Sequence, residues 1–116
     1  MTARAWIALV VAAVLVGAGL AWDAGLLAPR RPPLDESPAA VAAGQAVFAF
    51  RCAPCHRDVP LPGRVAGWSA QRAYEVIGRL PEVPRASMPP FQGTEEERRA
   101  LASFLAALGA GRARQP

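Results

Sequence analysis

The chain has few of the side chains from which metal and redox sites in proteins are built. Its 116 residues include two cysteines, one histidine and no lysine, so the net charge of +4 comes from arginine alone. A structural zinc site needs about four ligands, more than these cysteines and this histidine supply. The sequence also lacks the strand pattern in which a thioredoxin-like cysteine pair is found. Neither a zinc domain nor a thioredoxin fold is the favoured interpretation.

These scarce side chains stand together in one pentapeptide, Cys52-Ala53-Pro54-Cys55-His56. A C-x-x-C-H run is the attachment motif of a covalent haem. The thiols of Cys52 and Cys55 add to the two vinyl groups of one porphyrin, and the imidazole of His56 becomes the first axial ligand of its iron. The motif therefore predicts one covalent haem c. A zinc site completed by carboxylates, a redox dithiol and a chance match stay open as alternatives.

The sixth ligand of such an iron is mostly histidine, methionine or absent. Because His56 is the only histidine, bis-histidine ligation within one chain is excluded. Met1 precedes the apolar opening segment, which leaves Met88 as the candidate in the haem-bearing part. The following residue, Pro89, biases Met88 toward an extended conformation that can lay its thioether across a haem face. We predict His56 and Met88 as the iron ligands.

Three stretches have the periodicity and the caps of helices. They run over residues 38–50 after the N-cap Ser37, from Ser69 to Leu80 before Pro81, and from a capping box at Thr94 to the glycines at 109 and 111. Gly44 costs the first of them about 1 kcal/mol relative to alanine, so it indicates that another helix approaches closely. The pattern predicts an all-α domain.

The segment from about Ser37 to Leu108 resembles a small class I cytochrome c. The resemblance rests on the haem motif, on Gly44, Phe48 and Cys52 at four-residue intervals, on Leu101 with Phe104, and on the loop Met88-Pro89-Pro90-Phe91. It implies a cytochrome c fold of about three to four helices around one covalent haem, which transfers single electrons. It also implies that the carbonyl of a proline, Pro60 or Pro62, accepts the proximal imidazole N–H.

Other polar side chains near the predicted haem have two interpretations each. Arg51 and Arg57 flank the motif, where they either steer an acidic partner or are solvated charges or propionate partners. Trp68 and Tyr74 are expected to pack in the core or at the haem edge, with hydrogen bonds to haem propionates as the alternative.

The chain opens with eighteen uncharged residues, Ala5 to Trp22, between Arg4 and Asp23. A helix needs about 20 apolar residues to cross a bilayer, and tryptophans at both ends suit its interfaces. We predict a transmembrane anchor over residues 1–24, with Arg4 cytoplasmic and the remainder on the periplasmic side of a bacterial inner membrane. A cleavable signal peptide is the alternative.

The predicted domain order is the anchor, a proline-rich linker at 25–37, a haem domain at 38–110 and a tail at 111–116. At about 3.1 Å per residue, the extended linker holds the domain a few tens of ångströms from the membrane. We expect an electron carrier rather than an enzyme, serving redox partner proteins in membrane-bound respiratory complexes or acting as a cytochrome subunit of an oxidase or dehydrogenase. Neither a small-molecule substrate nor nucleic acid is expected. The alternative is a haem protein that binds ligands or catalyses at an open sixth position.

Overall fold

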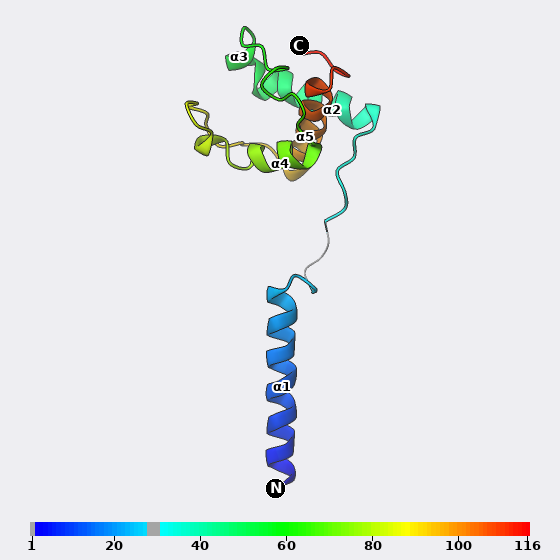
Figure 1. The fold of residues 1–116 in the computed structure, drawn as a ribbon, viewed down its shortest axis with the longest axis vertical. Coiled ribbons are helices and arrows are strands. Elements are labelled where there is room, and N and C mark those ends of the chain that lie inside the picture. The colour runs from blue at the N-terminus through cyan, green and yellow to red at the C-terminus, as the bar shows by residue number, and fades with distance from the viewer. Residues whose placement is uncertain (1, 28–30) are drawn as a thin grey trace. The chain divides into compact units, whose positions relative to one another are not determined.

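A computed structural model describes residues 2–27 and 31–116; Met1 and residues 28–30 of the predicted linker lie outside the described residues. The chain divides into two compact units, Met1–Pro32 and Pro33–Pro116. Figure 1 shows their elements: α1 (Ala3–Asp23), α2 (Pro38–Arg51), α3 (Ala53–His56), α4 (Ala70–Ile77), a 3-10 turn η1 (Leu80–Glu82) and α5 (Glu95–Gly109). No strand occurs in the described ranges, so the predicted all-α fold class is confirmed.

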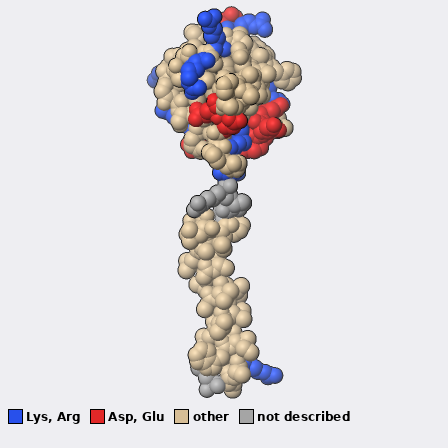
Figure 2. Space-filling model, turned by 90° about the vertical axis from the view of Figure 1, so that its right-hand side faces the viewer, with Lys and Arg blue, Asp and Glu red and all other residues tan. Residues whose placement is uncertain are grey.

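The first unit contains one long apolar helix, α1, which covers the predicted apolar run. Among the described residues it is the one helix long and apolar enough to cross a membrane. Its 21 residues rise about 30 Å. None of them is buried, and Figure 2 shows a surface almost free of charge along this helix. A helix that is apolar all round requires apolar surroundings, although a signal sequence near the N-terminus has the same character.

The second unit is built on the packing of α2 against α5, and α4 packs on α5 as well. Gly44 lies buried where α2 meets α5, and a Cβ at this position would overlap the carbonyl oxygen of Ala100. Next to this contact the rings of Phe48 and Phe104 lie with their centroids 5.4 Å apart. The predicted close approach of a second helix at Gly44 is confirmed.

Three predicted N-caps are present. The Ser37 hydroxyl accepts the N–H of Ala40 at 3.2 Å, and the Ser69 hydroxyl accepts the N–H of Arg72 at 3.1 Å. Thr94 forms the complete capping box at the start of α5. Each cap satisfies an N–H that has no partner inside its helix, which fixes where the three helices begin.

The helix after Ser69 ends earlier than predicted, at Ile77 rather than Leu80. Pro81 explains the difference, because it has no N–H to donate to the carbonyl of Ile77 and so cannot continue the α-helical pattern. The chain instead forms the 3-10 turn η1, which contains both Leu80 and Pro81.

Helix α5 ends at Gly109 in a Schellman motif. The N–H of Arg112 donates to the carbonyl of Ala107 at 2.8 Å, and the N–H of Gly111 donates to that of Leu108 at 3.2 Å. Gly111 has a φ of +73°, a conformation that favours glycine. The chain therefore reverses direction after α5, and Ala113 packs against the core.

The residues directly before α2 are attached to α5. A guanidinium N–H of Arg99 donates to the carbonyl of Pro33 at 2.7 Å, and the Ser103 hydroxyl donates to the carbonyl of Asp35. Leu34 packs against the core between them. The end of the predicted linker thus lies on the folded unit.

Candidate haem site

The C-x-x-C-H motif forms the single turn of α3, with Cys52 as its N-cap residue. The N–H of His56 donates to the carbonyl of Cys52 at 2.9 Å, and the N–H of Cys52 donates to that of Phe48 in α2 at 2.8 Å. Residues three and four positions apart share one face of a helix, so this turn presents Cys52, Cys55 and His56 on the same side. The α2–α5 core thereby positions the motif.

A cavity of about 320 Å³ lies beside this turn. Its wall contains Cys52, Cys55 and His56, and Met88 contributes from a distant part of the chain. The remaining lining residues are Phe50, Arg51, Leu80, Ser87, Pro89, Pro90, Phe91 and Gln92. All four predicted site residues therefore line the same cavity.

The imidazole of His56 has a buried nitrogen, Nδ1, without a hydrogen-bond partner among the described residues. Neither Pro60 nor Pro62 accepts from it, so the hydrogen bond expected from the resemblance is not present in this structure. A buried polar atom without a partner has lost its hydration without compensation. With two thiols and a thioether lining the same cavity, this histidine belongs to a donor set that fits haem c.

The two cysteines are not bonded to each other, and Cys52 is the less exposed of them. Burial raises the pKa of the Cys52 thiol, an effect that Arg51 opposes and the neighbouring Cys55 reinforces. Reactive cysteine pairs need a lowered thiol pKa, so this environment disfavours the redox dithiol. Within residues 2–27 and 31–116, no three His, Cys, Asp or Glu side chains are placed to hold a metal ion, which disfavours the zinc alternative.

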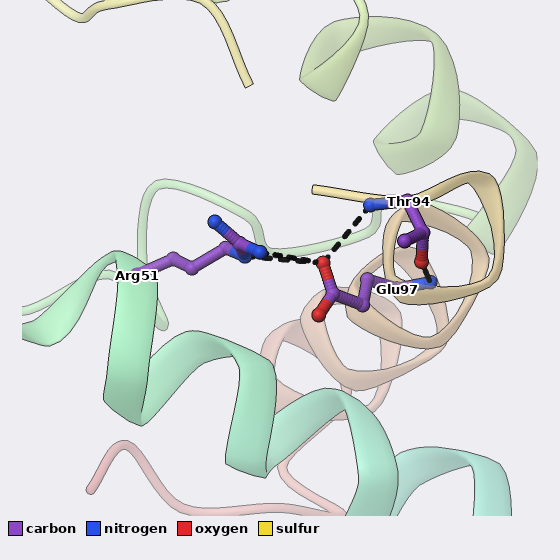
Figure 3. A network of polar contacts seen from close by, with 3 residues as sticks. All are labelled: Arg51, Thr94 and Glu97. Atoms are coloured by element: carbon purple, nitrogen blue, oxygen red, sulfur yellow. Dashed lines mark hydrogen bonds and ion pairs between the residues drawn. The ribbon is translucent and has the colours of Figure 1, made fainter. Parts of the chain in front are cut away.

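Arg51 joins the end of α2 to the start of α5, as Figure 3 shows. Its Nε and Nη2 atoms donate to Oε2 of Glu97 at 3.1 and 2.9 Å. The same carboxylate oxygen accepts the N–H of Thr94 at 3.0 Å, within the capping box. Sequence reasoning offered Arg51 as a steering charge or propionate partner and missed this ion pair, because no local pattern links residues so far apart.

Tyr74 is buried and uses its hydroxyl within the protein. The hydroxyl donates to a carboxylate oxygen of Glu95, and the guanidinium of Arg98 lies 3.8 Å from the ring centroid. The Nη2 of Arg98 also donates to the carbonyl of Tyr74 at 2.7 Å. This arrangement agrees with the expected core packing, and it leaves the hydroxyl engaged away from a haem propionate.

Met88 lies in the distal strap, which we define as residues 87–92. No residue of this strap forms a hydrogen bond with any other described residue. Pro89 and Pro90 fix φ at two successive positions, and Phe91 packs against the core. The conformation of the strap therefore depends on restricted backbone and on packing.

The four helices of the second unit, the C-x-x-C-H turn and the methionine on the opposite wall define a monohaem c-type cytochrome. The family model for cytochrome C oxidase, cbb3-type, subunit III, matches residues 39–105, more than half of the chain. The chain belongs to this family, and its cofactor is a covalently bound haem c. The predicted cytochrome fold and cofactor are thus confirmed. Comparison with curated proteins and with solved structures gives no match.

Proposed function

We propose that this protein is a membrane-tethered monohaem cytochrome that transfers single electrons on the extracytoplasmic side of a bacterial inner membrane. The observation that carries this proposal is that Cys52, Cys55, His56 and Met88 line one cavity. Cys52 and Cys55 would hold haem c through thioether bonds, and His56 and Met88 would bind its iron. When bound, haem c supplies an iron that takes up and returns one electron.

The chain's own residues hold the histidine side of this site and set the polarity of the cavity. The turn of α3 holds His56, because its backbone hydrogen bonds continue from α2. Apolar side chains such as Phe50 and Leu80 line the cavity and lower its polarity. A methionine ligand and a cavity of low polarity both favour the ferrous state and so raise the reduction potential.

The membrane assignment rests on α1, whose length and composition suit a single crossing. With the amino terminus and Arg4 on the cytoplasmic side, the haem domain faces the compartment in which covalent haem is attached. Family membership supports two roles, a cytochrome subunit of a membrane oxidase or a carrier between respiratory complexes. In both, the partners are redox proteins.

A second candidate function follows from the distal strap. Since residues 87–92 form no hydrogen bond with the rest of the described chain, Met88 is held less firmly than His56. A displaced Met88 opens the sixth position to carbon monoxide, nitric oxide or peroxide. In that case the protein is a ligand-binding or catalytic haem protein.

The visible spectrum of the ferric holoprotein distinguishes the two functions. The protein is produced in a host that attaches haem c, beside Met88→Ala and the control Gln92→Ala, which alters another residue of the same cavity wall. Electron transfer with His56 and Met88 as ligands predicts a weak long-wavelength sulfur-to-iron band in the wild type and the control, absent in Met88→Ala. A wild type with covalent haem but without this band supports the open-site function.

The membrane assignment has its own experiment. The intact mass of the holoprotein purified from membranes shows whether the opening apolar segment is retained. Protease added to spheroplasts tests whether the haem domain is accessible from outside. We expect the complete chain, with a haem domain cut from the outside. A mature chain that lacks the opening apolar segment and is found in the soluble periplasm contradicts the tether.

A further inference from the structure

The side chain of Gln115 connects the tail to the loop that follows the haem motif. Its Nε2 donates to the carbonyl of His56 at 2.8 Å and to the carbonyl of Val59 at 2.9 Å. Its Oε1 accepts the N–H of Leu61 at 2.8 Å. Both amide hydrogens and the amide oxygen are therefore used, on three backbone groups within six residues.

The end of α5 brings Gln115 to this position. The Schellman turn at Gly111 reverses the chain, and Ala113 packs against the core. A Cβ on Gly109 would overlap the carbonyl oxygen of Val65, so the loop backbone lies directly against the end of α5. Gln45 of α2 adds a longer hydrogen bond, at 3.4 Å, to the carbonyl of Arg114. The tail is thus part of the folded unit.

The loop after α3 is hydrogen-bonded to the rest of the described chain through Gln115. Among the described residues, nothing else beyond the stretch 52–65 forms a hydrogen bond with the backbone of residues 56–61. The carbonyl of His56 is also one of the last carbonyls of α3, which have no partner within so short a helix. This carbonyl accepts the N–H of Val59 at 3.2 Å, and the amide of Gln115 is its second and shorter hydrogen bond, at 2.8 Å.

We propose that Gln115 is a positioning residue for the proximal ligand, acting through the backbone of His56. This inference rests on the proposed function, in which His56 binds the haem iron. The imidazole has no partner of its own on Nδ1 among the described residues, so its orientation depends on the backbone that carries it. The three hydrogen bonds of Gln115 fix that backbone, and without them water would have to satisfy the freed carbonyl of Val59. Such supports orient a metal ligand without touching the metal.

The test compares haem-loaded, full-length Gln115→Leu with the wild type. Leucine has about the same size but forms none of the three hydrogen bonds. The matched control is Gln71→Leu, the same change at an exposed position of α4, where the amide donates only to Glu75 in the next turn. The readouts are the reduction potential, the g values in the ferric EPR spectrum, which report the orientation of the axial imidazole, and the rate of trypsin cleavage between Arg57 and Asp58.

We expect Gln115→Leu to shift the ferric-to-ferrous ratio about tenfold toward ferric, which lowers the potential by about 59 mV. The g values should change and cleavage after Arg57 should become faster, while Gln71→Leu matches the wild type in all three. Faster cleavage with an unchanged potential and unchanged g values overturns the proposal, because Gln115 then supports the loop only. No change in any readout overturns it as well.

A second variant covers the case in which Gln115→Leu does not retain haem. Gln115→Glu keeps an oxygen that can accept the N–H of Leu61. It loses the amide group that donates to the carbonyls of His56 and Val59, and places an ionised oxygen near them instead. It should lower the potential, and a wild-type potential in this variant overturns the proposal. Failure of the proposed function is a separate result, since it is seen in the wild type itself as absent haem or an absent sulfur-to-iron band.

Discussion

The two walls of the haem cavity are held in place by different means. On the proximal wall, the backbone from Cys52 to Leu61 is hydrogen-bonded to α2 at one end and to Gln115 at the other. On the distal wall, residues 87–92 form no hydrogen bond with other described residues and rely on Pro89 and Pro90. Moving the proximal wall requires hydrogen bonds to break, whereas moving the distal wall requires only a change in side-chain packing. Ligand exchange is therefore expected at Met88.

The largest loss of stability is expected from a change in the α2–α5 contact, which carries the C-x-x-C-H turn. In Gly44→Ala, the new methyl group overlaps the backbone of Ala100 and lies 2.7 Å from the Cβ of Phe104. Overpacking of this kind costs about 1–3 kcal/mol. The higher helix propensity of alanine returns about 1 kcal/mol, so most of the overpacking range leaves a net loss. We expect a net loss of unfolding free energy and weaker haem retention, measured by denaturant unfolding of the holoprotein.

The control is Gly63→Ala, because nothing lies within 4 Å of a Cβ added there. Its unfolding free energy should stay within about 0.5 kcal/mol of the wild type. Equal losses in the two variants would show that the close helix contact is not what supports the proximal wall.

The distal wall can be loosened through its prolines. Replacing Pro89 or Pro90 by alanine returns backbone freedom worth about 0.4–1 kcal/mol to the open strap. This predicts that carbon monoxide binds the ferrous protein about two to five times faster, as measured by flash photolysis or stopped flow. Pro60→Ala, on the proximal side, should bind carbon monoxide at the wild-type rate. If Pro60→Ala accelerates binding as much, the two walls do not differ as described.

A smaller effect is expected for the ion pair between α2 and α5. Arg51→Gln removes the bonds to Glu97, whose side chain is about one-third exposed. Partly exposed ion pairs contribute roughly 0.2–1 kcal/mol, and salt screens them. Denaturant unfolding should show this loss at low salt and less of it in 1 M salt. Arg57→Gln removes an exposed charge whose side chain forms no hydrogen bond or ion pair with another described residue, so it should leave stability and its salt dependence unchanged.

The smallest effect concerns Asp35 before α2. Its carboxylate accepts the N–H of Ser37 at 2.8 Å, and this hydrogen bond lowers the pKa of Asp35. A lowered pKa means that the stabilisation is complete above the ordinary carboxyl range and is lost as the pH falls through the lowered pKa. NMR titration should find this pKa below its usual value. Ser37→Pro, which removes the N–H, should raise it, and an unchanged pKa would contradict this cause.

Local signals in the sequence were sufficient for the starts of α2, α4 and α5 and for the haem motif. Ser37, Ser69 and Thr94 cap the helices that their spacing predicts, and Gly44 marks the helix contact. The haem ligands were predicted by elimination, since the chain has one histidine and few methionines. Their placement around one cavity agrees with that prediction, and their binding to iron stays a prediction.

The contacts that sequence reasoning missed all join segments far apart in the chain. Gln115 reaches a loop more than 50 residues earlier, and Arg51 reaches Glu97 across 46 residues. Glutamine in a tail and arginine on a helix are ordinary surface residues in any local pattern. Only the reversal of the chain after α5 and the close packing of α2 on α5 make these hydrogen bonds possible, and both are tertiary features.

The hydrogen bonds from α5 to Pro33 and Asp35 shorten the free linker between α1 and the haem domain. Only residues 24–32 remain between the end of α1 and the folded unit, and nine residues span at most about 30 Å. In the anchored arrangement that we propose, a neighbouring membrane protein therefore meets this haem at an effective concentration in the millimolar range. Tight binding then becomes unnecessary for fast exchange. The rate of electron delivery depends on which proteins are neighbours in the membrane, and hardly on how much cytochrome the cell contains.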